Sequence, residues 1–293
     1  MFGSNVFKTT LLFAILTAIL LVVAWFFGIN PIVALFMAAL MNLLIYWFSD
    51  RFVLMMTHAR LVSPVEAPQL HAIVDRLAVR AGIPKPRVAV VDSPIPNAFA
   101  TGRSPSHAAV CVHTGLLRSM NESEIEGVLS HELTHIRNWD TLTQVVAATF
   151  AGAIVYIARW GWFFGGFSGR DQERGQSNIL GILAVMIFAP IAATLVQLAI
   201  SRGREYAADE GGGRLSGKPE ALASALQKIE QIVRRHPMEG NPATSHLYIV
   251  NPFRGTTLLE LFSTHPATEK RVERLMRLAA EMRRAQGYSI AIE

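Results

Sequence analysis

Four long apolar stretches constrain what this chain can fold into more than any other feature of its sequence. They cover residues 11–27, 32–48, 142–164 and 179–200. The first, second and fourth contain no charged residue, and the third contains only Arg159. Each is long enough to cross the hydrocarbon core of a membrane as a helix. The sequence therefore predicts a membrane α-helical protein with four transmembrane helices.

The first two stretches are predicted to form a transmembrane hairpin within residues 1–60, because only residues 28–31 separate them. A cleaved signal peptide is an alternative for the first stretch, but its apolar core is too long and no small-residue cleavage site follows it. Lys8 precedes the hairpin, and Arg51 and Arg60 follow it. Because positively charged residues favour the cytoplasmic side of a membrane, both ends of the hairpin are expected there.

The other two stretches form a second predicted pair of spans within residues 141–200. Buried helices of a large soluble core are the alternative, but only 17% of the residues are charged, where a soluble domain has about a quarter. Gln144, Arg159 and Gln197 make this pair more polar than the first. Polar groups in spans usually face protein or water, so these helices are expected to be partly sheltered from lipid.

The remaining segments, residues 61–140 and 201–293, are predicted to be the two parts of one mostly helical, α+β domain. Helical spacing and capping residues predict its helices, short apolar runs predict its strands, and Pro, Gly and Asn mark the turns. The predicted helices cover residues 67–81, 121 onward, 204–210, 219–235 and 266–284; the predicted strands cover residues 87–92, 97–101 and 108–113; residues 236–257 are predicted to be a loop.

The sequence His131-Glu132-Leu133-Thr134-His135 carries the most specific chemistry. On a helix, positions i and i+4 share one face, so both imidazoles can reach a single ion. In this arrangement the two His bind zinc and the Glu acts as general base. A solvated helix face that happens to carry two His is the alternative. Asn121 and Glu124, a predicted capping pair, place the motif on a helix and favour the metal site.

A catalytic zinc needs a third protein ligand, and Glu205 is the candidate. Glu205 and Asp209 are spaced i, i+4 on a predicted helix, so Asp209 could accept a hydrogen bond from the far nitrogen of one His ligand. Two predicted spans separate His135 from Glu205, and an even number of spans returns the chain to the same side of the membrane. The same parity places the site on the cytoplasmic side, close to the bilayer.

Two further residues, His265 and Asn97, are predicted to take part. His265 precedes Pro266 and is the candidate for an auxiliary catalytic group that stabilises an oxyanion. The alternative for His265 is an ordinary N-terminal flank of the last helix. Asn97 lies in a segment that, like the strand near residues 110–113, could offer a free sheet edge to a peptide substrate.

An intramembrane zinc protease and a non-catalytic membrane adaptor with a metal site are the alternative functions. Arg137, Asn138 and Asp140 directly follow the motif, which places it at an interface rather than inside a span. The intact Glu132 argues against an adaptor. The net charge of +5 does not indicate nucleic-acid binding, because Lys and Arg flank the apolar stretches and no recognition motif accompanies them.

In these features the chain resembles the HtpX group of bacterial membrane metalloproteases, which are related to the prenyl-protein-processing zinc proteases of eukaryotic membranes. The resemblance covers nearly the whole chain. It rests on the early pair of apolar stretches and on four short segments, residues 96–102, 131–135, 205–209 and 263–266.

The resemblance implies a gluzincin-like peptidase domain on the cytoplasmic side, with one Zn²⁺ per subunit on His131, His135 and Glu205. It implies that Glu132 is the catalytic acid/base, and it favours the roles given above to Asp209 and His265. It also implies a multi-pass protein of the bacterial inner membrane. The implied substrates are misfolded or damaged polypeptides, above all membrane proteins, in stress-linked quality control.

Overall fold

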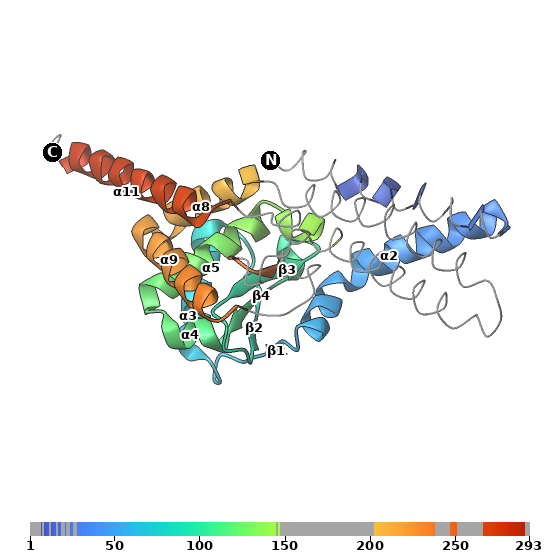
Figure 1. Ribbon diagram of the computed structural model, residues 1–293, viewed down its shortest axis with the longest axis horizontal. Coiled ribbons are helices and arrows are strands. Elements are labelled where there is room, and N and C mark those ends of the chain that lie inside the picture. The colour runs from blue at the N-terminus through green and yellow to red at the C-terminus, as the bar shows by residue number, and fades with distance from the viewer. Residues whose placement is uncertain are drawn as a thin grey trace, which may run out of the picture.

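A computed structural model describes residues 28–144, 146, 202–237, 247–250 and 266–290, together with scattered positions between residues 7 and 25. Figure 1 shows helices packed around a small sheet, with α2 projecting to one side of this body and α11 to the other. In chain order the elements are α2 (Pro31–Met56), β1 (Arg60–Leu61), α3 (Pro68–Ala81), β2 (Arg87–Val91), β3 (Ala98–Gly102), the 3₁₀ helix η1 (Pro105–His107), β4 (Ala108–His113), α4 (Thr114–Ser119), α5 (Glu122–Arg137), α8 (Arg202–Ser216), α9 (Pro219–Arg235) and α11 (Thr268–Ile290).

Helix α2 contains the second apolar stretch and begins where the Asn30 side chain accepts a hydrogen bond from the N–H of Ile32. Over Pro31–Phe48 its mean hydropathy is 2.0, yet only 11% of that window is buried in the protein. A core helix would be mostly buried, so this surface is suited to lipid. Among the described residues it is the one helix long and apolar enough to cross a membrane.

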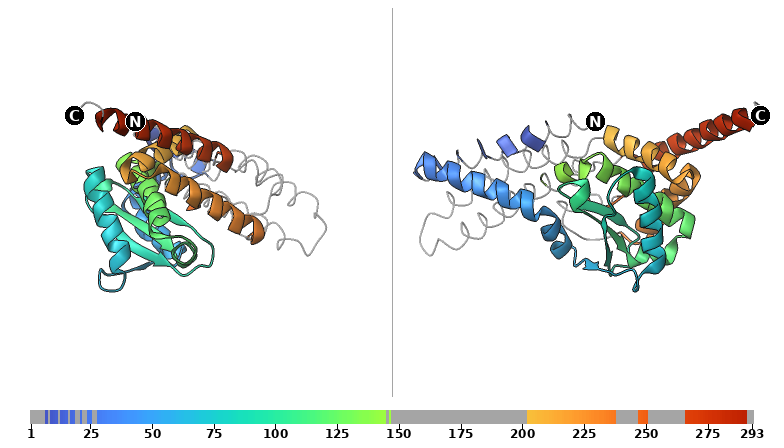
Figure 2. Two further views of the ribbon diagram at one scale, coloured as in Figure 1. Left: turned by 90° about the vertical axis from the view of Figure 1, so that its left-hand side faces the viewer. Right: turned by 180° about the vertical axis from the view of Figure 1, so that it is seen from behind.

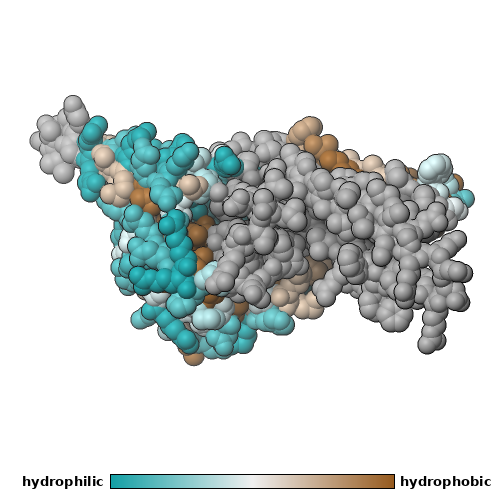
Figure 3. All heavy atoms as spheres, in the orientation of Figure 1, coloured by the Kyte–Doolittle hydropathy of each residue, from teal (hydrophilic) through white to brown (hydrophobic). Residues whose placement is uncertain are grey.

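The other predicted spans stay predictions. The first apolar stretch is described only at scattered positions, and the third and fourth lie almost entirely outside the described residues. Many exposed side chains of α2 are large and apolar, whereas hydrophilic residues cover most of the visible face of the body (Figure 3). The described part of the chain is therefore a polar body joined to one lipid-compatible helix.

The four strands form one mixed sheet in the order β1-β2-β4-β3. Strand β4 runs parallel to β2 and antiparallel to β3, with Phe99 opposite Cys111. The predicted strands at residues 97–101 and 108–113 are thus confirmed, with the first shifted by one residue, and they pair with each other. Because β4 lies between two strands, the prediction that residues 110–113 could offer a free edge is wrong. Strand β3 is one edge of the described sheet, and β1 is the other.

The main core lies between the sheet and helices α3, α5 and α9. Its fully buried side chains include Leu77 of α3, Val110 of β4, Val128 of α5 and Leu226 of α9. Burying such a side chain contributes about 1.5–3 kcal/mol. Helix α3 ends at Gly82, whose φ of 66° is left-handed and suits a residue without a side chain. This core holds α5, the helix of the predicted metal motif, rigidly in place.

Helix α8 was expected to end at Gly211, but it continues to Ser216. A Cβ on Gly212 would lie 2.8 Å from the backbone nitrogen of His131, and one on Gly211 would lie 2.6 Å from Cγ2 of Thr134. The glycines therefore let α8 approach α5 closely, and this packing outweighs their low helix propensity. Helix α11 also differs from its prediction, since it starts at Thr268 and extends to Ile290.

Candidate metal centre

Helix α5 carries both imidazoles of the predicted motif and begins at a complete capping box. The Asn121 side chain accepts a hydrogen bond from the N–H of Glu124, whose carboxylate accepts one from the N–H of Asn121. One turn apart, His131 and His135 project from the same face. They are 1% and 4% exposed, and their Nε2 atoms lie 3.2 Å apart.

Helix α8 brings Glu205 to these two nitrogens. Its carboxylate oxygens lie 3.8 Å from Nε2 of His131 and 3.6 Å from Nε2 of His135. One ligand atom from each of the three residues can be chosen so that all lie within 4.8 Å of one another. Two imidazole nitrogens and one carboxylate are a donor set that zinc accepts with a fourth position left open. The residues present therefore fit a catalytic zinc ion.

The far nitrogen of each imidazole meets a buried carboxylate. Nδ1 of His135 lies 3.0 Å from Oδ2 of Asp140, and Nδ1 of His131 lies 2.9 Å from Oδ1 of Asp209, although this second contact is bent away from hydrogen-bond alignment. Carboxylates in this position fix the tautomer, so that Nε2 is left to face a metal. Sequence reasoning singled out Asp209 but missed Asp140, because nothing in its spacing distinguishes it from an exposed residue after a helix.

Arg271, on α11, holds Asp209 from the other side. Its Nε and Nη2 donate to the two oxygens of Asp209 at 2.8 and 2.7 Å, and its Nη1 donates to the carbonyl of Ile249 at 2.8 Å. Burial opposes charge on both partners, but their mutual attraction prevails, so the pKa of Asp209 is lowered and the pKa of Arg271 is raised. Sequence reasoning missed Arg271 as well.

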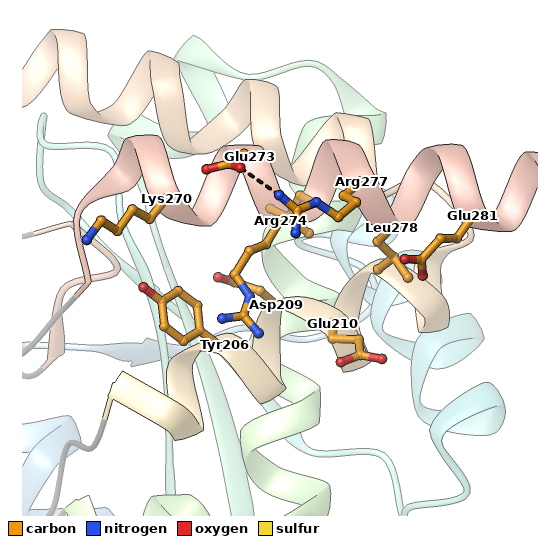
Figure 4. A pocket seen from close by; sticks show the side chains of 10 residues that line it. Tyr206, Asp209, Glu210, Lys270, Glu273, Arg274, Arg277, Leu278 and Glu281 are labelled. Carbon is orange, nitrogen blue, oxygen red and sulfur yellow. Dashed lines mark hydrogen bonds and ion pairs between the residues drawn. The ribbon is translucent and has the colours of Figure 1, made fainter.

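Figure 4 shows how α11 lies over α8 at this point. Asp209 points from α8 towards α11, and beside it the Arg274 guanidinium stacks 4.1 Å from the centre of the Tyr206 ring. Between the two helices is a hollow of about 610 Å³ lined mainly by charged side chains. The end of α11 nearest the metal centre is thus fixed to α8 by a buried ion pair and a stacked cation.

Glu132 faces a cavity of about 20 Å³ beside the two imidazoles and Glu205. That volume is enough for about one water molecule. Burial raises the pKa of Glu132, and the neighbouring His131 and His135 only partly oppose this effect. A carboxylate whose pKa is raised is a stronger base and is better suited to accept a proton from water.

The side chain of Asn97 is engaged within the protein. Its Nδ2 donates to the carbonyl of Leu247 at 2.9 Å, and its Oδ1 accepts from the N–H of Ile249 at 3.0 Å. Tyr248 and Ile249 also line the cavity beside Glu132. Asn97 therefore holds residues 247–249 against the site. Its predicted contact with substrate stays a prediction, and His265 lies outside the described residues.

Replacing Asn97 with Ala is expected to loosen residues 247–249, because a buried carbonyl and a buried N–H lose their partners. Each such loss costs about 1–3 kcal/mol. We expect hydrogen exchange of the Ile249 amide to accelerate about tenfold or more, while amides of α9 exchange as before. Unchanged exchange at Ile249 would show that other contacts hold the segment.

Comparisons with known proteins agree with this geometry. The model of peptidase family M48 matches residues 64–279. A protein named Protease HtpX homolog from Pyrococcus furiosus is 56% identical over 281 residues, covering 94% of this chain and 96% of that protein. Proteins of the same name from Thermococcus kodakarensis and Aquifex aeolicus are 57% and 50% identical, covering 94% and 86% of this chain, and 96% and 85% of their own lengths.

A solved structure, S. mikatae Ste24p, matches with a TM-score of 0.51 at 19% sequence identity. The match covers 91% of this chain, which spans 64% of the length of that protein. At this identity the similarity concerns the fold. Together with the family model and the relatives, it shows that the chain belongs to peptidase family M48 and is a membrane metalloprotease of the HtpX type.

Proposed function

We propose that this protein is a zinc-dependent endopeptidase whose metal is held by His131, His135 and Glu205 and whose general base is Glu132. The convergence of these three ligand groups beside the buried Glu132 carries the proposal. A zinc ion held there would supply Lewis-acid chemistry, lowering the pKa of a water molecule and polarising a peptide carbonyl.

The chain's own residues handle the proton. Glu132 accepts a proton from the attacking water and returns it to the nitrogen of the leaving amine. Its buried position excludes bulk water, which would otherwise compete for that proton. Asp140 and Asp209 keep the two imidazoles oriented with Nε2 towards the metal. His265 is proposed to stabilise the oxyanion from outside the ligand set.

The substrate is proposed to be an extended polypeptide that pairs with β3. This strand is one edge of the described sheet and runs beside α5. Ala98, Phe99 and Ala100 line the same cavity as Glu132, which the other edge strand, β1, does not. An extended peptide can add itself to such an edge through main-chain hydrogen bonds. By analogy with the HtpX group, the substrates are misfolded or damaged proteins, membrane proteins above all.

We further propose a multi-pass placement in the inner membrane with the site on the cytoplasmic face. The positive residues around the apolar stretches and the even number of predicted spans between His135 and Glu205 support it. An intramembrane protease is disfavoured because the motif helix packs inside the polar body against α3, α8 and α9. An adaptor is disfavoured by the buried, cavity-facing Glu132.

The test is cleavage of casein by the purified full-length protein in detergent. Activity should disappear with excess chelator and return when zinc is added back. Cleavage that persists in excess chelator, with the metal shown to be gone, would exclude this mechanism.

Replacing Glu205 with Ala should weaken zinc binding by more than about 100-fold. Losing a residue that only hydrogen-bonds to a metal ligand lowers the affinity by at most about 100-fold, and a ligand itself should contribute more. The matched control is Glu210→Ala, on the same helix, where the carboxylate is 58% exposed and pairs with Arg214. Zinc affinity is measured by competition with a chromophoric chelator. Equal affinity in the two variants would remove Glu205 from the ligand set.

A further inference from the structure

A cleft of about 620 Å³ lies where the last apolar turns of α2 meet the body, and it shares no lining residue with the cavity at the metal centre. One wall is apolar and belongs to α2. The other wall is polar and comes from the residues that follow the apolar window of α2, the start of β2 and the β3–β4 connection. The lining residues are Leu43, Leu44, Trp47, Phe48, Asp50, Arg51, Lys85, Arg87, Arg103, Ser106, His107 and Ala108.

The apolar wall lies at the end of the span. Leu43, Leu44, Trp47 and Phe48 are 47–53% exposed and belong to the window that is apolar enough to cross a membrane. Trp47 packs edge-on to Tyr46 at 6.0 Å between ring centres. Trp and Tyr concentrate at the level of lipid headgroups. When α2 crosses a membrane, this cleft therefore opens at the headgroup level.

The polar wall carries four cations against one carboxylate. Asp50 is buried and pairs with Arg87, while Lys85 pairs with Asp75 at an exposed position where such pairs are weak. Arg51 and Arg103 have no carboxylate partner in the described part of the chain. The Arg103 guanidinium lies 4.6 Å from the centre of the Trp47 ring and donates to the Trp47 carbonyl at 3.2 Å. Arg51 lies 5.8 Å from the Phe48 ring.

We propose that this cleft is a binding site for an anionic phospholipid. The phosphate lies against Arg51 and Arg103, with Lys85 beside them, and an acyl chain follows Leu43 and Leu44 along α2. Basic pockets at the ends of spans bind lipid headgroups in this way. A free phosphate would use the cations but gain nothing from the apolar wall. The proposal rests on α2 crossing the membrane and is independent of the metal centre.

The experiment titrates the full-length protein, in neutral detergent, with phosphatidylglycerol or phosphatidylcholine and counts bound lipids by native mass spectrometry. Wild type should bind phosphatidylglycerol about tenfold or more tightly than phosphatidylcholine, since each cation contributes about fivefold. Arg51→Gln with Arg103→Gln should lose about 25-fold in phosphatidylglycerol affinity. The matched double variant, Arg277→Gln with Arg283→Gln, removes two exposed cations of α11 and should change nothing.

Two results would overturn the proposal without any variant. The first is equal affinity of wild type for the two lipids. The second is complete displacement of phosphatidylglycerol by millimolar inorganic phosphate, which would indicate a site for free anions. Equal phosphatidylglycerol affinity of the Gln double variant and wild type would overturn it too. Arg51→Lys with Arg103→Lys keeps both charges and should retain most of the binding. Lipid binding is scored without peptidase activity, so its failure leaves the proposed function intact.

Discussion

Replacing Glu132 with Gln is expected to lower kcat/KM for peptide hydrolysis about 10²- to 10⁴-fold while leaving the zinc content unchanged. Gln has the same shape as Glu and fills the same buried position, so the cavity and the two imidazoles keep their arrangement. It cannot accept the proton of the attacking water. Activity is measured on casein or a quenched fluorescent peptide, and zinc content by elemental analysis of the same samples.

The matched control for this variant is Glu126→Gln. Glu126 lies on the same helix and is also buried, but it pairs with Lys218 and does not line the cavity. Its replacement should leave kcat/KM within a few-fold of wild type. Full activity of Glu132→Gln with full zinc occupancy would end the proposed mechanism. Loss of both activity and zinc would instead give Glu132 a part in metal binding.

The metal helix could be predicted from sequence because its information is local. Two His one turn apart share a face on any helix, and Asn121 with Glu124 marks where the helix starts. Glu205 could also be predicted from sequence, because its spacing to Asp209 and the even number of predicted spans limited where a third ligand could come from. In the described residues, these side chains lie together as that reasoning expected.

What could not be predicted depends on packing between helices. Three consecutive glycines normally end a helix. Here they continue it, because Gly211 and Gly212 pack closely against Thr134 and His131, and Gly213 packs against Pro219 and Leu278. Asp140 follows α5 like any solvated residue, and its contact with His135 exists only in the folded chain. No local pattern distinguishes such residues from their exposed neighbours.

Arg271 is a further residue whose burial could not be predicted from the local sequence pattern. It shares α11 with Arg274 and Arg277 at three-residue spacing, and the sequence describes all of them as one basic helix. The structure buries Arg271 to 1% exposure and leaves the other two at the surface. The buried guanidinium then links Asp209, beside a predicted zinc ligand, to the backbone of residue 249, beside the cavity. Its replacement should therefore affect the fold and the site together.

Replacing Arg271 with Leu is expected to destabilise the protein by about 3–5 kcal/mol, because it leaves the Asp209 carboxylate buried without its partner. The melting temperature should fall by about 5–15 °C. Arg277→Leu is the control, since Arg277 is 69% exposed and pairs with Glu273 on the same helix, where a pair contributes less than about 1 kcal/mol. Both are measured by thermal unfolding of the full-length protein in one detergent.

A double variant separates the cost of an unpaired charge from the loss of packing. In Arg271→Leu with Asp209→Asn no buried charge is left unpaired, so the double variant should be more stable than Arg271→Leu alone. Its zinc affinity should nevertheless fall about 10- to 100-fold, because His131 loses the carboxylate that orients it. If the double variant were less stable than Arg271→Leu alone, charge compensation would not be what Arg271 provides. If it bound zinc as tightly as wild type, Asp209 would have no part in positioning His131.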